Sequence, residues 1–478
     1  MVLLTAAVLS AASDPDLANA VRNQDSATIG RLLQNRADVN AAQPDGATAL
    51  HWAAHLDDLA TAELLLRAGA KVDASNDLGI TPLLVACRDA SEAMVEKLLA
   101  AGANPNRANS TGETPLMAAA RVGNAEAVQS LLKHRAEVNA KESSHGQTAL
   151  MWAVAQRHPR VVRLLLEYKA DVNARSNITQ AAVYTGVPTV QAGRSAAALV
   201  ETVGMGGSTP LLFAARIGDL ESAKLLLDAA ANVQDAAPDG TSALVIAAHS
   251  GQGKVAALLL DRGADPKAAL SGYTALHAAV LRNDLDLVNA LLAHGADPNA
   301  RITKPTPVAR EGQDYTLPVT LLGATPFFLA AKYAEADIMR ALVTGGADKR
   351  FVMKDGTTPL MAAAGVGWTF QANRRGALNV APPTADDERR GLEAVQLALE
   401  LGGDAKAVNQ ASETALHGAA AKGFNSIIEL LVANGAQLAV KNRRGQTPLS
   451  LTPEPRGPGS AADLLRKLGA KEDTPPLK

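Results

Sequence analysis

The sequence predicts an all-α fold, a solenoid of about twelve helix–turn–helix repeats with hairpin-like fingers and three insertions. A Thr-Pro-Leu or Thr-Ala-Leu phrase recurs along the 478 residues at intervals of 32 to 34 residues, interrupted by three longer intervals of 61, 51 and 56. Such a fixed period is typical of repeat architectures. Hydrophobic residues make up 47% of the chain but aromatic residues only 3%, so we expect thin layers packed through small side chains. The residue that opens the phrase is Thr48, Thr81, Thr114, Thr148, Thr209, Ser242, Thr274, Thr325, Thr358, Thr414 or Thr447.

Each repeat predicts two short helices, as residues 109–141 illustrate. Thr114 can cap the first helix, with Pro115 at its first position, where no amide donor is needed. Gly123 ends that helix, and the second helix carries Val128 inward on one apolar face. Because neither helix can bury its apolar face alone, each repeat has to stack on its neighbours.

The recurring phrase resembles the T-P-L-H-x-A signature of the ankyrin repeat. It reads TALHWAA at 48–54, TALHAAV at 274–280 and TALHGAA at 414–420, and one second helix ends in GADPNA at 295–300. The resemblance covers about residues 14–473 and implies a binding scaffold. Ankyrin arrays recognise other proteins through their hairpin tips and the inner face of the first helices, and the repeat itself carries no catalytic chemistry.

The two ends of the array depart from the pattern, as expected of repeats with one face in water. The first repeat, 14–42, lacks the phrase, and ten internal repeats lead to a last repeat, 442–473, in which three prolines displace the usual helix. These prolines are Pro453, Pro455 and Pro458. The whole organisation, with its insertions and N-terminal segment, is also similar to that of ankyrin proteins encoded by environmental bacteria.

Residues 1–13 are interpreted as the remnant of a signal segment. Residues 2–9 are apolar and are followed by small residues of the kind found at signal cleavage sites, although the usual basic segment is missing. The alternative is an apolar extension of the first helix. A signal favours a periplasmic or secreted protein, and the alternative a cytoplasmic one. The sequence contains no run of about 18 apolar residues, so no membrane-spanning helix is predicted. Residues 474–478 are expected to form a C-terminal tail.

Charge and cysteine content exclude several classes of site. The formal net charge is −2, so the chain lacks the electrostatic footprint of a nucleic-acid-binding protein. The single cysteine, Cys87, excludes an intramolecular disulfide and is expected in the packed interior. The resemblance assigns the signature histidines to hydrogen bonds between repeats rather than to a metal site. These are His51, His277 and His417. No cofactor, metal site or catalytic residue is predicted.

A discontinuous basic stripe is predicted on the concave face. It consists of the residues seven places after the aligned Thr, near the exposed end of the first helices. The basic members are Arg88, Arg121, Arg216 and Lys332. One interpretation is that a long, soluble, helix-favouring residue is simply common at this position. The sharper hypothesis is that the stripe meets an acidic surface of a protein partner.

Two insertions enlarge hairpin fingers, at about 177–206 and 302–322. The first contains Tyr184 and few charges, and a wholly disordered segment is usually more polar. The second contains Tyr315 and three prolines that favour extended chain. We hypothesise that the two fingers flank one binding surface over residues 207–301. The alternative is loop growth without a role.

The third insertion splits one repeat between its first and second helices. Thr384 and Asp387 form a capping-box-like start, so a long second helix is predicted over 385–402 with protruding polar first turns, after a loop at 369–383. An aromatic and basic cluster opens the loop and either covers the helix pair or anchors a partner. Its members are Trp368, Phe370, Arg374 and Arg375.

Three function classes follow. The leading one is a non-enzymatic scaffold that binds a protein partner through the concave face and fingers, as a monomer. The second is an inhibitor or neutralising partner of one specific protein. The third is an enzyme with a site in an insertion, although no insertion contains a convincing acid–base or metal set.

Overall fold

The computed structural model describes residues 16–184, 200–306, 317–367, 383–454 and 457–471, and the side chains of 181–184 and 200–203 are outside this description. The chain divides into two compact units. Unit 1 comprises residues 1–178 and 206–232, and unit 2 comprises residues 179–205 and 233–478. Each unit is a stack of paired α-helices.

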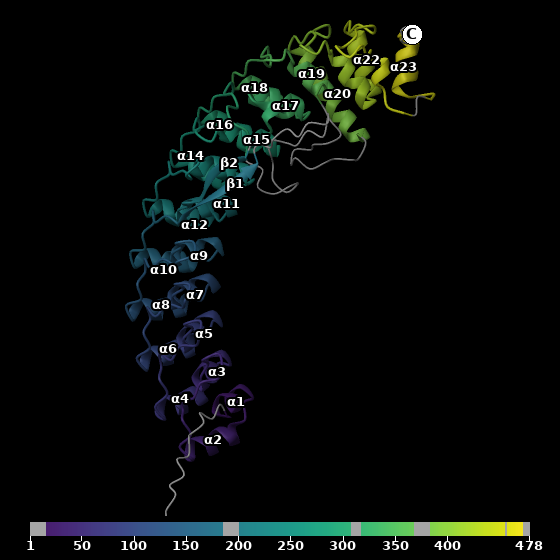
Figure 1. Cartoon of the computed structure of the whole chain (residues 1–478). Helices are drawn as coiled ribbons and strands as arrows, with labels where there is room; N and C mark the ends of the chain where they lie inside the picture. The colour runs from purple at the N-terminus through teal and green to yellow at the C-terminus, as the bar shows by residue number, and fades with distance from the viewer. Residues whose placement is uncertain (1–15, 185–199, 307–316, 368–382, 455–456, 472–478) are drawn as a thin grey trace, which may run out of the picture. The chain divides into compact units, whose positions relative to one another are not determined.

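In unit 1 the helices form two rows, one of first helices and one of second helices (Figure 1). The first helices are α1 (Asp16–Arg22), α3 (Ala49–His55), α5 (Pro82–Arg88), α7 (Pro115–Val122), α9 (Ala149–Ala155) and α11 (Pro210–Ile217). The second helices are α2 (Ser26–Gln34), α4 (Leu59–Arg67), α6 (Glu92–Ala100), α8 (Ala125–Lys133), α10 (Pro159–Glu167) and α12 (Leu220–Asp228).

The pair α7 and α8 shows why the sequence folds in this way. The hydroxyl of Thr114 accepts a hydrogen bond from the Met117 amide at 3.3 Å, which satisfies one of the free donors at the helix start. Gly123 ends α7 with φ of 84°, a conformation that glycine adopts without a Cβ clash. Leu116 and Leu131 are almost completely buried, so the apolar faces of both helices meet between the two rows.

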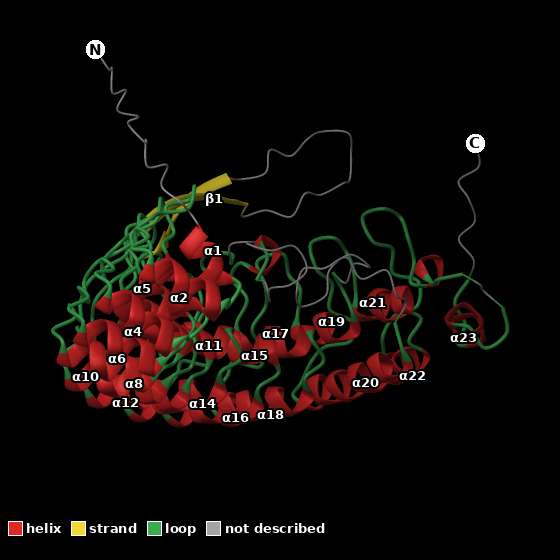
Figure 2. Cartoon of the chain, turned by 90° about the horizontal axis from the view of Figure 1, so that it is seen from below, coloured by secondary structure: helices red, strands yellow, loops and turns green. Residues whose placement is uncertain are grey.

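Unit 2 repeats the arrangement, with its first and second helices again in separate rows (Figure 2). The first helices are α13 (Ala243–His249), α15 (Ala275–Arg282), α17 (Pro326–Lys332), α19 (Pro359–Ala364) and α21 (Ala415–Lys422). The second helices are α14 (Gly253–Asp261), α16 (Leu285–Ala293), α18 (Ala336–Thr344), α20 (Ala385–Glu400) and α22 (Asn425–Ala433).

The last repeat departs from the others where its prolines lie. Its first helix is reduced to the single 3-10 turn η2 (Leu449–Leu451), which is followed by α23 (Ala461–Lys467). Pro453 stands two residues after η2 and cannot donate the amide hydrogen bond that would continue a helix. The truncated first helix is therefore a consequence of the local sequence.

The first insertion contains the two strands of the described chain, β1 (Ile178–Tyr184) and β2 (Val200–Gly206), which pair in one sheet. At its base, the Asn177 amide donates to the His145 carbonyl at 2.6 Å and the Gly207 amide donates to the Asn177 carbonyl at 3.1 Å. The described helices fit the expected all-α solenoid, and this β-ribbon is an addition to it within the first insertion. Alternating β-branched residues such as Val200 and Thr202 favour strand over helix.

The second insertion closes on itself at its base. The Thr306 amide donates to the Leu317 carbonyl at 3.1 Å, and the Leu317 amide donates to the Thr306 hydroxyl at 2.8 Å. A 3-10 turn, η1 (Val319–Leu321), follows. Leu317 is fully buried, so it packs within the chain and offers no apolar contact to a partner.

The third insertion separates α19 from α20. Helix α20 begins at Ala385, as the sequence predicts, and the Thr384 amide donates to the Asp387 carboxylate at 2.8 Å in a capping box. Residues 384–387 at the start of the helix are exposed, whereas the next turn contacts both neighbouring repeats. Arg390 forms an ion pair of 2.9 Å with Glu335 of the preceding repeat, and Glu388 accepts a hydrogen bond of 2.8 Å from the Ser426 amide of the next.

The described residues contain neither a membrane-spanning helix nor a cluster of metal-ligating side chains. None of the described helices has both the length and the apolar character needed to cross a membrane. In the same part of the chain, no group of three or more His, Cys, Asp or Glu side chains is arranged to hold a metal ion.

Candidate functional site

We call one side of the first helices in unit 1 its inner face. Counted from the Thr that opens the recurring phrase of each repeat, this side carries the fourth and the seventh residues. These positions lie one helical turn apart and therefore share a face. At the fourth position, the half-buried aromatic side chains are Trp52, Trp152 and Phe213. The seventh position carries His55, Arg88, Arg121, Ala155 and Arg216.

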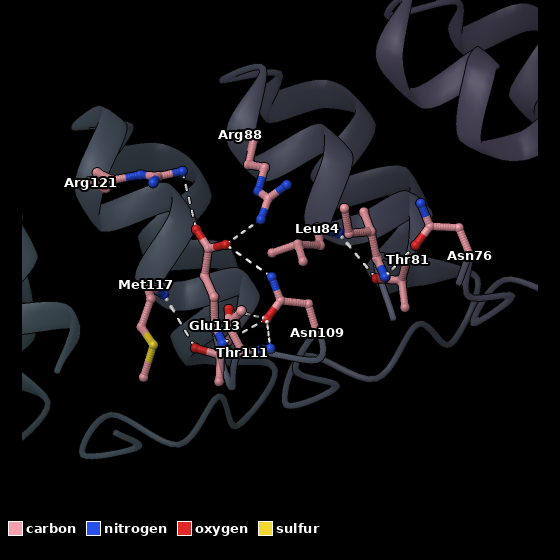
Figure 3. A network of polar contacts seen from close by, with 11 residues as sticks. Asn76, Thr81, Leu84, Arg88, Asn109, Thr111, Glu113, Met117 and Arg121 are labelled. Carbon is pink, nitrogen blue, oxygen red and sulfur yellow. Dashed lines mark hydrogen bonds and ion pairs between the residues drawn. The ribbon is translucent and has the colours of Figure 1, made fainter. Parts of the chain in front are cut away.

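Arg88 and Arg121 converge on one carboxylate. Arg88, at the end of α5, and Arg121, near the end of α7, point toward Glu113 from neighbouring helices (Figure 3). The Arg121 Nη2 lies 3.1 Å from Glu113 Oε1, and Arg88 Nη2 contacts Glu113 Oε2. The Glu113 side chain is 15% exposed, so this pair of contacts is shielded from water more than an ordinary surface ion pair.

The finger before α7 holds Glu113 in place. Asn109 Nδ2 donates to Glu113 Oε2 at 3.2 Å, while Asn109 Oδ1 accepts from the amides of Thr111 and Glu113 at 3.0 Å each (Figure 3). The asparagine thereby fixes the turn and the carboxylate together. Glu113 is a positioned residue rather than a mobile surface acid.

Each inner-face tryptophan has an arginine over its ring. The guanidinium carbon of Arg121 lies 5.6 Å from the ring centroid of Trp152, and that of Arg22 lies 5.5 Å from the ring centroid of Trp52. These are cation–π distances. Trp52 Nε1 also donates to Gln43 at 2.7 Å, so the indole is oriented at both its face and its edge.

The remaining charges of this face leave an excess of basic groups. His55 Nδ1 lies 2.8 Å from the Asp89 carboxylate. Arg216 is exposed and has no ion pair among the described residues. Glu113 is therefore the shared carboxylate partner of Arg88 and Arg121. Arg22 and Arg216 have no carboxylate partner among the described residues.

The four residues of the basic stripe predicted from the sequence are divided between the two units. Arg88, Arg121 and Arg216 belong to unit 1, whereas Lys332 belongs to unit 2, at the end of α17. Burial lowers the pKa of Lys332. Burial, and then the nearby charge of Lys332, lower the pKa of Lys422 to about 8. The stripe is not a row of equivalent exposed cations.

Six of the predicted partner-binding residues have side chains outside the described part of the chain. The side chain of Tyr184, at the end of β1, is outside the described part. The other five lie outside the described residues altogether: Tyr315, Trp368, Phe370, Arg374 and Arg375.

The signature histidines have the structural role that the resemblance implies. In each, Nδ1 accepts from the amide of the aligned Thr and Nε2 faces a backbone carbonyl of the following repeat. The Nε2 distances are 2.9 Å from His51 to Ile80, 3.4 Å from His277 to Ala324 and 3.3 Å from His417 to Gln446. Burial, the largest cause, lowers the pKa of all three, that of His277 to about 4.

Cys87 is also structural. It is fully buried on α5 beside Arg88, and burial raises the pKa of its thiol. A protonated, enclosed thiol is a poor nucleophile. The expectation of a buried small side chain is confirmed.

Trp52, Trp152, Arg22 and Glu113 were not among the residues predicted from the sequence. A signal for the tryptophans was present, because both occupy the fourth position after the aligned Thr, three repeats apart. The role of Glu113 had no such signal. Among the repeats of unit 1 that carry the phrase, only this one has an acid directly before the Thr that opens it.

Stacked helix pairs joined by histidine contacts define a repeat scaffold, and comparison with known families places it. A model of three ankyrin repeats matches residues 17–109, 90–176, 193–269 and 211–302, and a single-repeat model matches 412–443. Together the matches cover more than half of the chain, which belongs to the ankyrin-repeat family. Ankyrin repeats imply a role in protein–protein interaction, and the family is typically non-enzymatic.

Curated relatives match parts of the array. Ankyrin repeat and SOCS box protein 16 of Homo sapiens is 30% identical over 208 residues, which are 39% of this chain and 42% of that protein. B-cell lymphoma 3 protein homolog of Mus musculus is 28% identical, with 40% and 42% covered. Probable E3 ubiquitin-protein ligase XBOS34 of Oryza sativa subsp. japonica is 34% identical, with 26% and 20% covered. Each match spans less than half of the relative's length.

Proposed function

We propose that this chain is a non-enzymatic scaffold that binds a protein partner through the inner face of its first helices and its fingers. The observation that carries this proposal is the inner face of unit 1, where Trp52 and Trp152 remain half-buried under arginines. Tryptophan and arginine are enriched among the residues that dominate protein–protein binding. The half-buried indoles leave apolar surface on this face that a partner can cover.

We also propose that the array contains twelve repeats and that its insertions take part in binding. The first helices of the described chain, with η2 in the last repeat, fit twelve repeats. The fingers at 177–206 and 302–322 are each proposed to contribute to partner binding. Deleting each insertion separately and measuring both stability and partner capture tests this, and unchanged capture by both deletions removes the fingers from the proposal.

An inhibitor of one protein and a ligase are narrower functions than a general scaffold. An inhibitor of one specific protein is a scaffold with a single target, and no described feature favours it over a general scaffold. Ligase activity is not carried over from the relative that is named a probable ligase, because the match covers 20% of that protein. A bacterial source and export rest on residues 1–13 and the insertions alone.

Site-specific photo-crosslinking in the native host tests the proposal. A benzophenone amino acid replaces Phe213 or Trp152 on the inner face, and Tyr168 at the end of α10 is the matched aromatic control, 38% exposed. We expect a discrete protein adduct at the inner positions and none at Tyr168. Absence of a protein adduct at every position contradicts the proposed function.

A further inference from the structure

We infer that the inner face of unit 1 takes an acidic protein segment with an apolar or aromatic side chain near each end. This inference rests on the proposed scaffold function and specifies the chemistry of the partner. The binding surface is formed by Trp52 and Trp152 with the arginines Arg88 and Arg121 between them. The two arginines that share Glu113 are where a carboxylate of the partner binds.

The hydrogen bonding of the two arginines is incomplete in the free chain. A carboxylate binds a guanidinium best through two parallel N–H donors. Here the two oxygens of Glu113 are divided among Arg88, Arg121 and Asn109, so neither arginine has a carboxylate to itself. Arg88 Nε is buried and has no hydrogen-bond partner among the described residues. A second carboxylate at this position completes what Glu113 supplies only in part.

The charge of the surface selects for an acidic partner. Two guanidinium groups share one carboxylate at Glu113, and Arg22 and Arg216 add positive charge on the same row of first helices. Asp89, which follows α5, lies against His55. An acidic segment therefore finds a basic surplus, whereas a basic segment meets like charge.

The tryptophans set the length of the segment. Trp52 and Trp152 stand three repeats apart, and helix layers pack about 8–10 Å apart, so the two rings are separated by roughly 30 Å. An extended chain covers about 3.3 Å per residue, and about nine residues span the distance. The partner thus places one apolar side chain on each indole and its acids on the arginines between.

A defined peptide tests this inference on the full chain. The probe is a labelled ten-residue peptide with Trp at both ends and four Glu-Gly pairs between, and its counterpart carries Lys in place of Glu. Binding is measured by fluorescence anisotropy at low and physiological salt. We expect the Glu peptide to bind at least tenfold more tightly than the Lys peptide, and the double variant R88E/R121E to lose that preference.

Two further variants separate a binding role from a structural one. R160E/R163E makes the same charge change on the exposed arginines of α10 and is expected to bind like the wild type. Glu113→Gln releases both arginines and is expected to tighten binding of the Glu peptide about threefold or more. A purely structural cluster predicts no tightening. Protection of Cys87 from a thiol reagent shows that α5 stays folded in each variant.

Several outcomes overturn the inference. They are equal binding of the Glu and Lys peptides, equal loss in the control variant, weaker binding by Glu113→Gln, and binding of a ten-nucleotide poly-dT as tight as that of the Glu peptide. If inner-face crosslinks form but R88E/R121E leaves them unchanged, the scaffold function stands and the acidic-segment inference fails. If no crosslink forms anywhere, the proposed function itself fails.

Discussion

Nη2 of Arg121 lies 3.1 Å from Oε1 of Glu113, with 37% of the arginine side chain and 15% of the glutamate side chain exposed. The two residues belong to one repeat, at the two ends of the turn and helix that it contributes to the inner face. Arg88 of the preceding repeat reaches the same carboxylate. One acid thereby connects two layers of the solenoid.

This contact predicts a measurable coupling energy. In a double-mutant cycle with Arg121→Ala and Glu113→Ala, followed by urea denaturation, we expect roughly 0.5–1 kcal/mol, because the pair is partly shielded but still hydrated. The exposed pair Arg160 and Glu126 is the control, with a coupling near zero. Equal coupling in both pairs would show that shielding of Glu113 has no energetic effect.

The buried histidine His277 predicts acid sensitivity of unit 2. Its pKa is lowered from 6.5 to about 4 in the folded chain, so the unfolded chain binds the proton more readily. Its contribution to stability is fully present above pH 6.5 and is lost as the pH falls toward 4. The loss amounts to about 2 kcal/mol at pH 5.

Thermal denaturation at pH 7 and pH 5 measures this effect, with His277→Gln compared against the wild type. The variant is less stable at pH 7, because Thr274 and Ala324 lose a hydrogen-bond partner, and its stability falls less between the two pH values. A wild type and variant with the same pH dependence would contradict the burial argument. Substitution of the exposed His134 is the control.

The extension of α20 predicts a contrast between two adjacent arginines. Arg390→Ala removes the ion pair to Glu335, whose side chain is 9% exposed, and a hydrogen bond to the Tyr333 carbonyl. We expect a loss of about 1–3 kcal/mol. Arg389→Ala removes contacts to Asp386 and Glu393 within the exposed face of the same helix, and its expected loss of stability is much smaller.

Hydrogen exchange of the α18 and α20 amides measures this contrast locally. Faster exchange in both helices is expected for Arg390→Ala only. If Arg389→Ala has the same effect, the extension stabilises unit 2 through its own helix content and not through the contact with the preceding repeat.

Replacing glycine by alanine is expected to change stability in opposite directions at Gly418 and at Gly30. A Cβ at Gly418 would lie 2.5 Å from the Val366 amide nitrogen, in backbone that cannot move aside easily, so Gly418→Ala is expected to cost about 1–3 kcal/mol. Gly30 lies in α2 with nothing within 4 Å of the same Cβ, and Gly30→Ala is expected to gain about 0.5–1 kcal/mol. Chemical denaturation decides between these signs, and a neutral Gly418→Ala would mean that α19 and α21 can separate.

The sequence predicted the repeats well, because their determinants are local. The capping Thr, the Pro at the first helical position and the apolar face recur within each 33-residue repeat, and the capping box of Thr384 and Asp387 lies within four residues. Each of these features depends on neighbours in the chain and can be read from spacing alone.

The contacts between repeats could not be predicted in the same way. Glu388 and Arg390 contact residues that lie 38 and 55 positions away in the sequence. The sharing of the Glu113 carboxylate depends on how two layers stack. The strands β1 and β2 were missed because the repeat period suggested helices only. The stripe residues Arg88 and Arg121 were identified by position, but their pairing with Glu113 was not.

Quantitative capture from the native host tests the central claim most directly, that the inner face of unit 1 binds a protein partner. The full chain, R88E/R121E and R160E/R163E are immobilised at equal density, and the retained proteins are compared by mass spectrometry. We predict a protein retained by the full chain and R160E/R163E and lost from R88E/R121E. Identical retention by all three chains would contradict the claim.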